Sequence, residues 1–174
     1  MVKRKGVNQH YENMFEKWLR ENGILYIAID ETKKPQYDGA SVKNFDFIVS
    51  SFNGKFLIDI KGKQFSYGQS GSWENWIRTT DISGLKLWAS HFNAFTPLLV
   101  YPYLLSDPSH QELFSDVYTF RNGTYGVVAI DLATFYIHAK PRYQSWDAIS
   151  VSRRIFRDLA KPVSHFIPEL KKGW

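Results

Sequence analysis

The sequence predicts an α/β domain with a mixed central β-sheet flanked by helices. Three observations lead to this fold class. An amphipathic helix pattern is followed at once by a short apolar run. An Asn-Gly turn joins two further apolar runs. A second helix pattern then stops before a proline, and another apolar run follows it.

Composition places the chain among ordinary globular proteins. Its 174 residues are 44% hydrophobic and 22% charged, which suits one domain spanning residues 1–174. No apolar run reaches the ~18 residues of a membrane span, so no membrane partner is expected. Without cysteine there is no disulfide framework or zinc–thiolate site, and no secretory signal precedes the first helix. We expect a cytoplasmic protein.

The positive charge is concentrated near the C-terminus. Residues 1–138 hold 14 basic and 14 acidic side chains, whereas residues 139–174 hold eight basic and three acidic ones, which accounts for the net charge of +5. Such a basic extension favours a polyanionic partner, and nucleic acid is the usual one. The alternative is a solvated helix face.

The first helix is predicted over residues 7–22. Tyr11, Phe15 and Trp18 fall on one face, and Glu12 and Glu16 border this apolar stripe one turn apart. Residues 24–29 (ILYIAI) form a continuous apolar run that predicts a buried strand, and residues 30–40 form a polar loop.

Residues 43–61 are predicted to form a β-hairpin around the Asn-Gly turn at 53–54. Asp46 lies in its first strand, and Asp59 and Lys61 lie at the end of the second. Residues two apart on a strand project from one face, so Asp59 and Lys61 stand side by side, and the register decides whether Asp46 joins them. Two carboxylates and an ammonium group on one sheet indicate a metal site with an attached lysine.

The segment 62–80 is predicted to be a long connection. It mixes glycine, serine and basic residues with aromatic ones, including Trp73 and Trp76. Aromatic side chains beside basic groups can stack on nucleobases. Alternatively, the tryptophans anchor the loop to the core.

The later elements follow the same logic. A helix is predicted from residue 81 to the turn before Pro97, followed by a buried strand at 98–104. A second Asn-Gly hairpin spans 117–130, and Asp131 caps a helix that runs to 139. A short strand at 148–151 precedes a helix capped by Ser152, whose arginines face outward.

The order of these features resembles the PD-(D/E)XK nuclease superfamily, particularly Holliday-junction resolvases and restriction-type endonucleases. The features are a helix glutamate, a strand, Asn44-Phe45-Asp46, a hairpin, Asp59-Ile60-Lys61, and a helix–strand unit. The proline of the first motif is missing, and Asp stands where Glu is commoner in the second. The resemblance covers residues 8–104 and implies a restriction-endonuclease-like fold. It favours Glu12 over Glu16 as the helix carboxylate.

The resemblance implies a divalent-metal-dependent nuclease, and the expected kind is an endodeoxyribonuclease. Asp46 and Asp59 are hard oxygen ligands suited to Mg²⁺ or Mn²⁺, the resemblance adds the carbonyl of Ile60, and Glu12 completes the shell. Lys61 positions or activates water. The nucleic-acid-binding side chains are expected to be Lys63, Gln64, Arg78, Arg142, Arg153, Arg154 and Arg157.

Double-stranded or branched DNA is the expected substrate, and a homodimer would suit the cutting of both strands. Two alternatives stay open. One is a nucleic-acid-binding protein that keeps the nuclease fold but does not cut, and the other is an oligomeric interaction protein. The choice between DNA and RNA also stays open.

Overall fold

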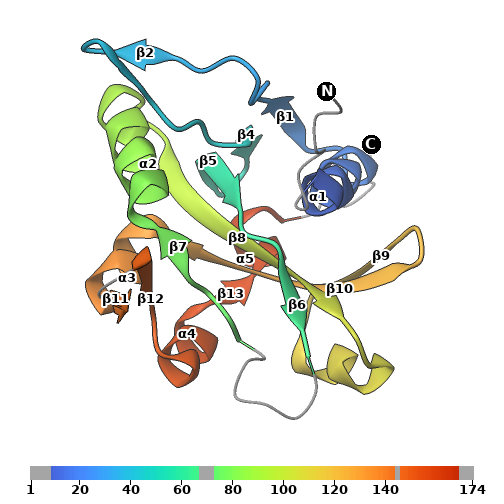
Figure 1. Cartoon of the computed structure of the whole chain (residues 1–174). Coiled ribbons are helices and arrows are strands. Elements are labelled where there is room, and N and C mark those ends of the chain that lie inside the picture. Colours follow the sequence, from blue (N-terminus) through green and yellow to red (C-terminus); the bar gives the residue numbers. More distant parts are fainter. Residues whose placement is uncertain (1–8, 67–72, 144–145, 169–174) are drawn as a thin grey trace, which may run out of the picture.

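A single eight-stranded sheet forms the centre of the computed structural model, which describes residues 9–66, 73–143 and 146–168 (Figure 1). Its strands are β1 (Leu25–Ala28), β4 (Phe47–Ser51), β5 (Gly54–Ile60), β6 (Lys63–Phe65), β8 (Thr96–Leu105), β9 (Val117–Phe120), β10 (Gly123–Asp131) and β13 (Lys161–Pro162). They are ordered β1-β4-β5-β8-β10-β13, with β6 also on β8 and β9 also on β10. The β5–β8 and β6–β8 pairs are parallel and the others are antiparallel, so the sheet is mixed as predicted.

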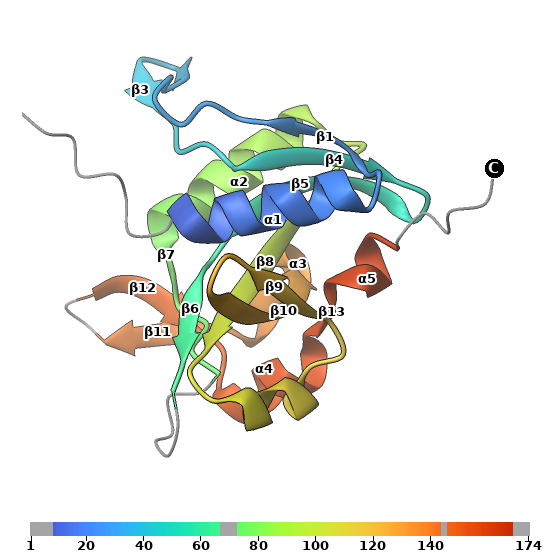
Figure 2. The same ribbon diagram turned by 90° about the vertical axis from the view of Figure 1, so that its right-hand side faces the viewer.

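Helices cover both faces of the sheet (Figure 2). They are α1 (Gln9–Glu21), α2 (Thr79–His91), α3 (Leu132–His138), α4 (Arg153–Leu159) and α5 (Val163–Phe166), with a 3₁₀ helix at Pro108–Leu113. Side chains of α1 and α5 form one hydrophobic cluster with the sheet, and those of α2, α3 and α4 form the other. The predicted α/β class, with helices flanking a mixed sheet, is confirmed. None of the described helices is long and apolar enough to cross a membrane.

Two small sheets complete the fold. One contains β7 (Ile77–Arg78), β11 (Lys140–Tyr143) and β12 (Trp146–Ser150), and the other is the short pair β2 (Gln36–Tyr37) and β3 (Ala40–Ser41). The β2–β3 pair extends away from the body of the molecule beyond α2 (Figure 1). In the chain this pair comes between β1 and β4, where the sequence predicts only a polar loop.

The run at 24–29 forms a strand, but the prediction that it is buried is wrong. Leu25 is 75% exposed and Ile27 is 59% exposed, whereas Ile24 is buried. The reason is position: among the strands that the structure describes, β1 pairs only with β4 and forms one edge of the sheet. An apolar run cannot by itself distinguish a central strand from an edge strand.

The segment 62–80 is only partly a connection. Residues 63–65 form β6, which continues the line of β5 along β8 in the same register after a break at Lys61 and Gly62. Residues 77–78 form β7, and residues 67–72 lie outside the described residues.

Gly62 lets the first helix approach the end of β5. A Cβ atom at this position would lie 2.0 Å from Cδ2 of Tyr11, whose ring lies over the glycine. Tyr11 is 6% exposed and belongs to the apolar face of α1. The contact therefore fixes the N-terminal turns of α1 against the break between β5 and β6.

We expect Gly62→Ala to lower the free energy of unfolding by about 2 kcal/mol, because the added methyl group forces helix and strand apart. Urea unfolding followed by circular dichroism measures this loss. In a Tyr11→Leu background the same substitution should be less costly, since the ring that it meets has gone. An equal loss in both backgrounds would contradict the assigned contact.

Candidate active site

A cavity of about 660 Å³ opens where α1, the β4–β5 hairpin and α2 meet. Its wall comes from α1, the segment after β1, the residues before β4, the end of β5, β6, β7 and the first turn of α2. The residues to which the sequence analysis gives chemical roles all line it: Glu12, Asp46, Asp59, Ile60 and Lys61. Positions up to 49 residues apart in the chain thus share one site.

Of the two candidate glutamates on α1, Glu12 lines the cavity and Glu16 does not. The Oε1 atom of Glu16 accepts hydrogen bonds from the hydroxyl of Tyr26 at 3.0 Å and from Arg20 at 3.2 Å. Glu16 is therefore part of a polar contact between α1 and β1. Glu12 is the carboxylate that α1 offers to the cavity.

The hairpin register brings the two aspartates together. Phe47 pairs with Ile58, which places Asp46 one position further on, across from Asp59. Oδ2 of Asp46 accepts a hydrogen bond of 2.5 Å from the backbone N–H of Ile60. Asp46 is 5% exposed and Asp59 is 2% exposed. Two carboxylates are therefore buried side by side at the end of the hairpin.

Burial and crowding of charge raise the pKa values of these carboxyl groups. Burial, the charge of Asp59 and a hydrogen bond with Glu31 raise the pKa of Asp46 well above its usual value. Burial also raises the pKa of Asp59, although the ammonium group of Lys61 opposes the shift. Buried anions of this kind are stabilised by a cation.

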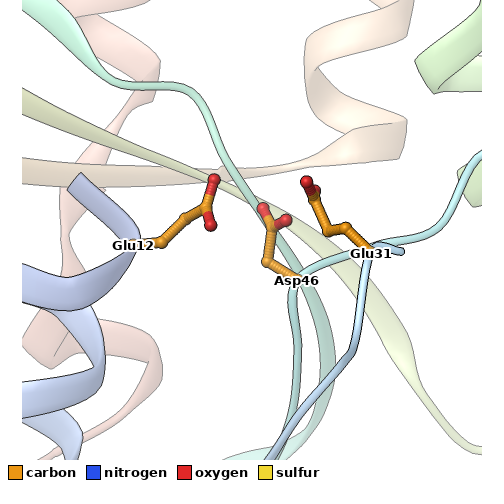
Figure 3. Close-up of side chains that lie close together, drawn as sticks. All are labelled: Glu12, Glu31 and Asp46. Atoms are coloured by element: carbon orange, nitrogen blue, oxygen red, sulfur yellow. The ribbon is translucent and has the colours of Figure 1, made fainter. Parts of the chain in front are cut away.

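Glu12, Glu31 and Asp46 form an acidic cluster that can hold a metal ion (Figure 3). One carboxylate oxygen from each lies within 4.8 Å of the others, and the three come from α1, the segment after β1 and the residues before β4. Burial first and Glu31 second raise the pKa of Glu12 to about 7. The donor set fits a hard divalent cation, because such ions prefer carboxylate oxygens.

Asp59 has a different neighbour. Its Oδ2 atom lies 2.6 Å from Nζ of Lys61, and the same ammonium group lies 2.7 Å from Oδ2 of Asp81. Burial opposes the charge of Lys61, but the two aspartates outweigh it and raise its pKa above the usual value. The lysine is thus held between two carboxylates, one from β5 and one from α2.

Three residues that line the cavity were not predicted from the sequence: Glu31, Lys43 and Asp81. The feature that locates Glu31 is the pairing of β1 with β4. This pairing is antiparallel, so it places the residues after β1 beside Asp46. Lys43 lies 3.5 Å from Glu31, and its pKa is raised because Glu31 and Asp59 outweigh the opposing effect of burial. The helix predicted from residue 81 begins two residues earlier, at Thr79, so Asp81 lies in the first turn of α2, and its carboxylate contacts Lys61.

The residues expected to bind nucleic acid fall into two groups. Lys63 and Arg78 line the cavity, and so does Trp76. Nζ of Lys63 lies 3.6 Å from the ring centroid of Trp76. Burial, with a smaller effect from Lys61, lowers the pKa of Lys63 to about 8. Gln64 is exposed and does not line the cavity.

The basic extension lies apart from this cavity. Arg142 and Arg153 contact Glu74 at 2.5 Å and 2.8 Å, and all three line a second cavity of about 400 Å³. Arg154 and Arg157 are exposed on α4. The extension's charge is therefore partly neutralised by Glu74 and partly open to solvent.

The mixed sheet, its flanking helices and the order of the elements define a class of fold, the restriction-endonuclease-like fold. Among solved structures, the chain is similar to Hjc, a Holliday junction resolvase from the archaeal hyperthermophile Archaeoglobus fulgidus. The TM-score is 0.52 and the identity is 8%, over 90% of this chain and 97% of the resolvase. No protein-family model and no curated protein matches the sequence.

We expect Asp46→Asn to raise the free energy of unfolding of the metal-free protein by about 1 kcal/mol, as substitutions at strained sites often do. The amide keeps an oxygen for the N–H of Ile60, removes one buried charge and can donate to Glu12 or Glu31. Urea unfolding in the presence of EDTA measures the change.

The matched control is Asp38→Asn in the exposed β2–β3 turn, where Asp38 has a φ of 51° that asparagine also adopts. It should stay within about 0.5 kcal/mol of the unsubstituted protein. A loss of stability in Asp46→Asn would contradict the view that crowded carboxylates destabilise the metal-free site.

Proposed function

We propose that the protein is a divalent-metal-dependent nuclease that hydrolyses phosphodiester bonds in DNA. The observation that supports this most directly is the acidic cluster of Glu12, Glu31 and Asp46 beside the Asp59–Lys61 pair in one cavity. The nuclease-type fold of the chain adds to it.

The proposed ligands are Asp46 at the centre, with Glu12, Glu31 and Asp59 around it and the carbonyl of Ile60 nearby. When bound, Mg²⁺ or Mn²⁺ would lower the pKa of water and offset charge on the phosphate. The backbone N–H of Ile60 orients Asp46 by donating to its Oδ2 atom. The position of Glu12 depends on the seating of α1 at Gly62.

Lys61 is proposed to act as a cationic hydrogen-bond donor. Asp59 and Asp81 favour its charged form and fix the position of Nζ. In this state it can orient a water molecule or donate to the negative charge that develops on the phosphate. Asp81 is a positioning residue, because it acts through the lysine.

Double-stranded or branched DNA is the proposed substrate. Lys63 and Arg78 would bind phosphates inside the cavity, and Arg142, Arg153, Arg154 and Arg157 would bind a more distant part of the duplex. One solved structure to which the chain is similar is a Holliday junction resolvase, which supports a branched substrate. A homodimer would supply one centre for each strand.

We expect Lys61→Met to lower the single-turnover rate of Mn²⁺-dependent cleavage of a branched DNA about 100- to 1,000-fold, the usual cost of losing one well-placed donor. Lys55→Met is the control, because Lys55 is exposed on β5, the strand that leads to Lys61, and does not line the cavity. DNA binding measured in EDTA separates loss of chemistry from loss of fold. Cleavage at the normal rate in Lys61→Met would contradict the proposed mechanism.

A second test concerns the metal ligands. We expect Glu31→Gln to weaken Mn²⁺ binding at least about tenfold in isothermal titration calorimetry, because it removes one carboxylate of the cluster. Glu16→Gln, from the same protein but outside the cavity, should bind Mn²⁺ normally. If Glu31→Gln also binds normally while Asp59→Asn does not, the metal is held by the aspartate pair and not by the acidic cluster.

A further inference from the structure

The two tryptophans of segment 73–78 have different surroundings. Trp73 packs in the core, with ring centroids 5.4 Å from Phe65, 5.1 Å from Phe114 and 5.6 Å from Tyr103. It therefore anchors the segment, as one of the two sequence interpretations expects. Trp76 is only partly buried and lines the main cavity.

The partner of Trp76 is a cation. Nζ of Lys63 lies 3.6 Å from its ring centroid, and no aromatic ring within the described ranges pairs with it. Lys63 likewise forms no ion pair with a carboxylate of the described residues, so its ammonium group is held against the indole. Arg78 lies two residues further along the wall. This part of the cavity thus combines a flat apolar surface with two positive charges.

Such a surface matches one nucleotide. An indole stacks on any nucleobase, because every base has a π-face. Lys63 covers one face of the Trp76 ring, so a base would stack on the opposite face. The neighbouring ammonium and guanidinium groups suit the flanking phosphates. The acidic cluster and Lys61 line the same cavity, so the nucleotide would lie close to the proposed reacting phosphate.

The free energy of stacking must exceed the cost of exposing the base, and this comparison decides which nucleotides can bind to the indole. Stacking on an aromatic side chain contributes about 1–3 kcal/mol per base. Taking a paired base out of a duplex costs a few kcal/mol, which cancels this gain. At a flap, a gap or a branch the base is already unpaired, so most of the gain remains.

We propose that Trp76 is a stacking platform for an unpaired nucleobase beside the scissile phosphate, with Lys63 and Arg78 binding the flanking phosphates. This inference deepens the proposed function, since it names DNA with an unpaired nucleotide at the cutting site as the preferred substrate class. Trp76 is then a specificity-determining residue.

The test is equilibrium binding in EDTA, measured by fluorescence anisotropy. The probes are a duplex with a single-stranded flap and a continuous duplex of equal length. Trp76→Leu should weaken binding to the flap about 5- to 150-fold and leave binding to the duplex within about twofold. Trp76→Phe should retain most of the flap affinity. Phe52→Ala, at an aromatic residue 84% exposed in the β4–β5 turn, should change neither.

A second measurement reports stacking directly. With 2-aminopurine as the first unpaired base, binding of the unsubstituted protein should quench its fluorescence, and Trp76→Leu should abolish the quenching. Equal weakening on both probes, or quenching that survives the substitution, would overturn the proposal. Because no metal is present, a failure of the protein to cleave DNA would refute the proposed function without affecting these readouts.

Discussion

The burial of two aspartates at the end of one β-hairpin is the constraint on which the rest of the site depends. Asp46 and Asp59 are almost fully enclosed, and buried carboxylates require donors or cations as neighbours. The N–H of Ile60 donates a hydrogen bond to Asp46, and the ammonium group of Lys61 forms an ion pair with Asp59. Both partners directly follow Asp59 in the chain, so residues 59–61 supply the carboxylate and its stabilising groups together.

Two close approaches bring the remaining residues to this hairpin. The ring of Tyr11 lies over Gly62, which seats α1 and carries Glu12 into the cavity. On the other side, a Cβ atom at Gly84 would lie 2.7 Å from the carbonyl oxygen of Lys43, and Trp88 donates to the same oxygen at 3.1 Å. This second contact seats α2, whose first turn carries Asp81 to Lys61. Helix packing therefore determines which charges meet.

The sequence predicts the features that depend on local chemistry. Turn signals and apolar periodicity give the hairpin and the helix that bears Glu12, whereas the register that brings Asp46 to Asp59 comes from the structure. They cannot give the path of an irregular segment, so Glu31 was treated as part of a polar loop. Nor do they reveal that Glu74 pairs with Arg142 and Arg153, which are 68 and 79 residues away along the chain. Such ion pairs have no sequence pattern, because only the tertiary fold brings the partners together.

The division of charge within the cavity explains how a polyanion can enter an acidic site. Glu12, Asp46 and Asp59 alone would repel phosphate, most strongly where the dielectric is low. The wall also carries basic side chains from the segment before β4, from the break after β5, and from β6 and β7, namely Lys43, Lys61, Lys63 and Arg78. The phosphates of a polyanion can bind these basic side chains, and the carboxylates then remain available to bind a cation. Trp76 lines the same cavity and contacts Lys63, so a base whose phosphates bind these cations would lie near the indole.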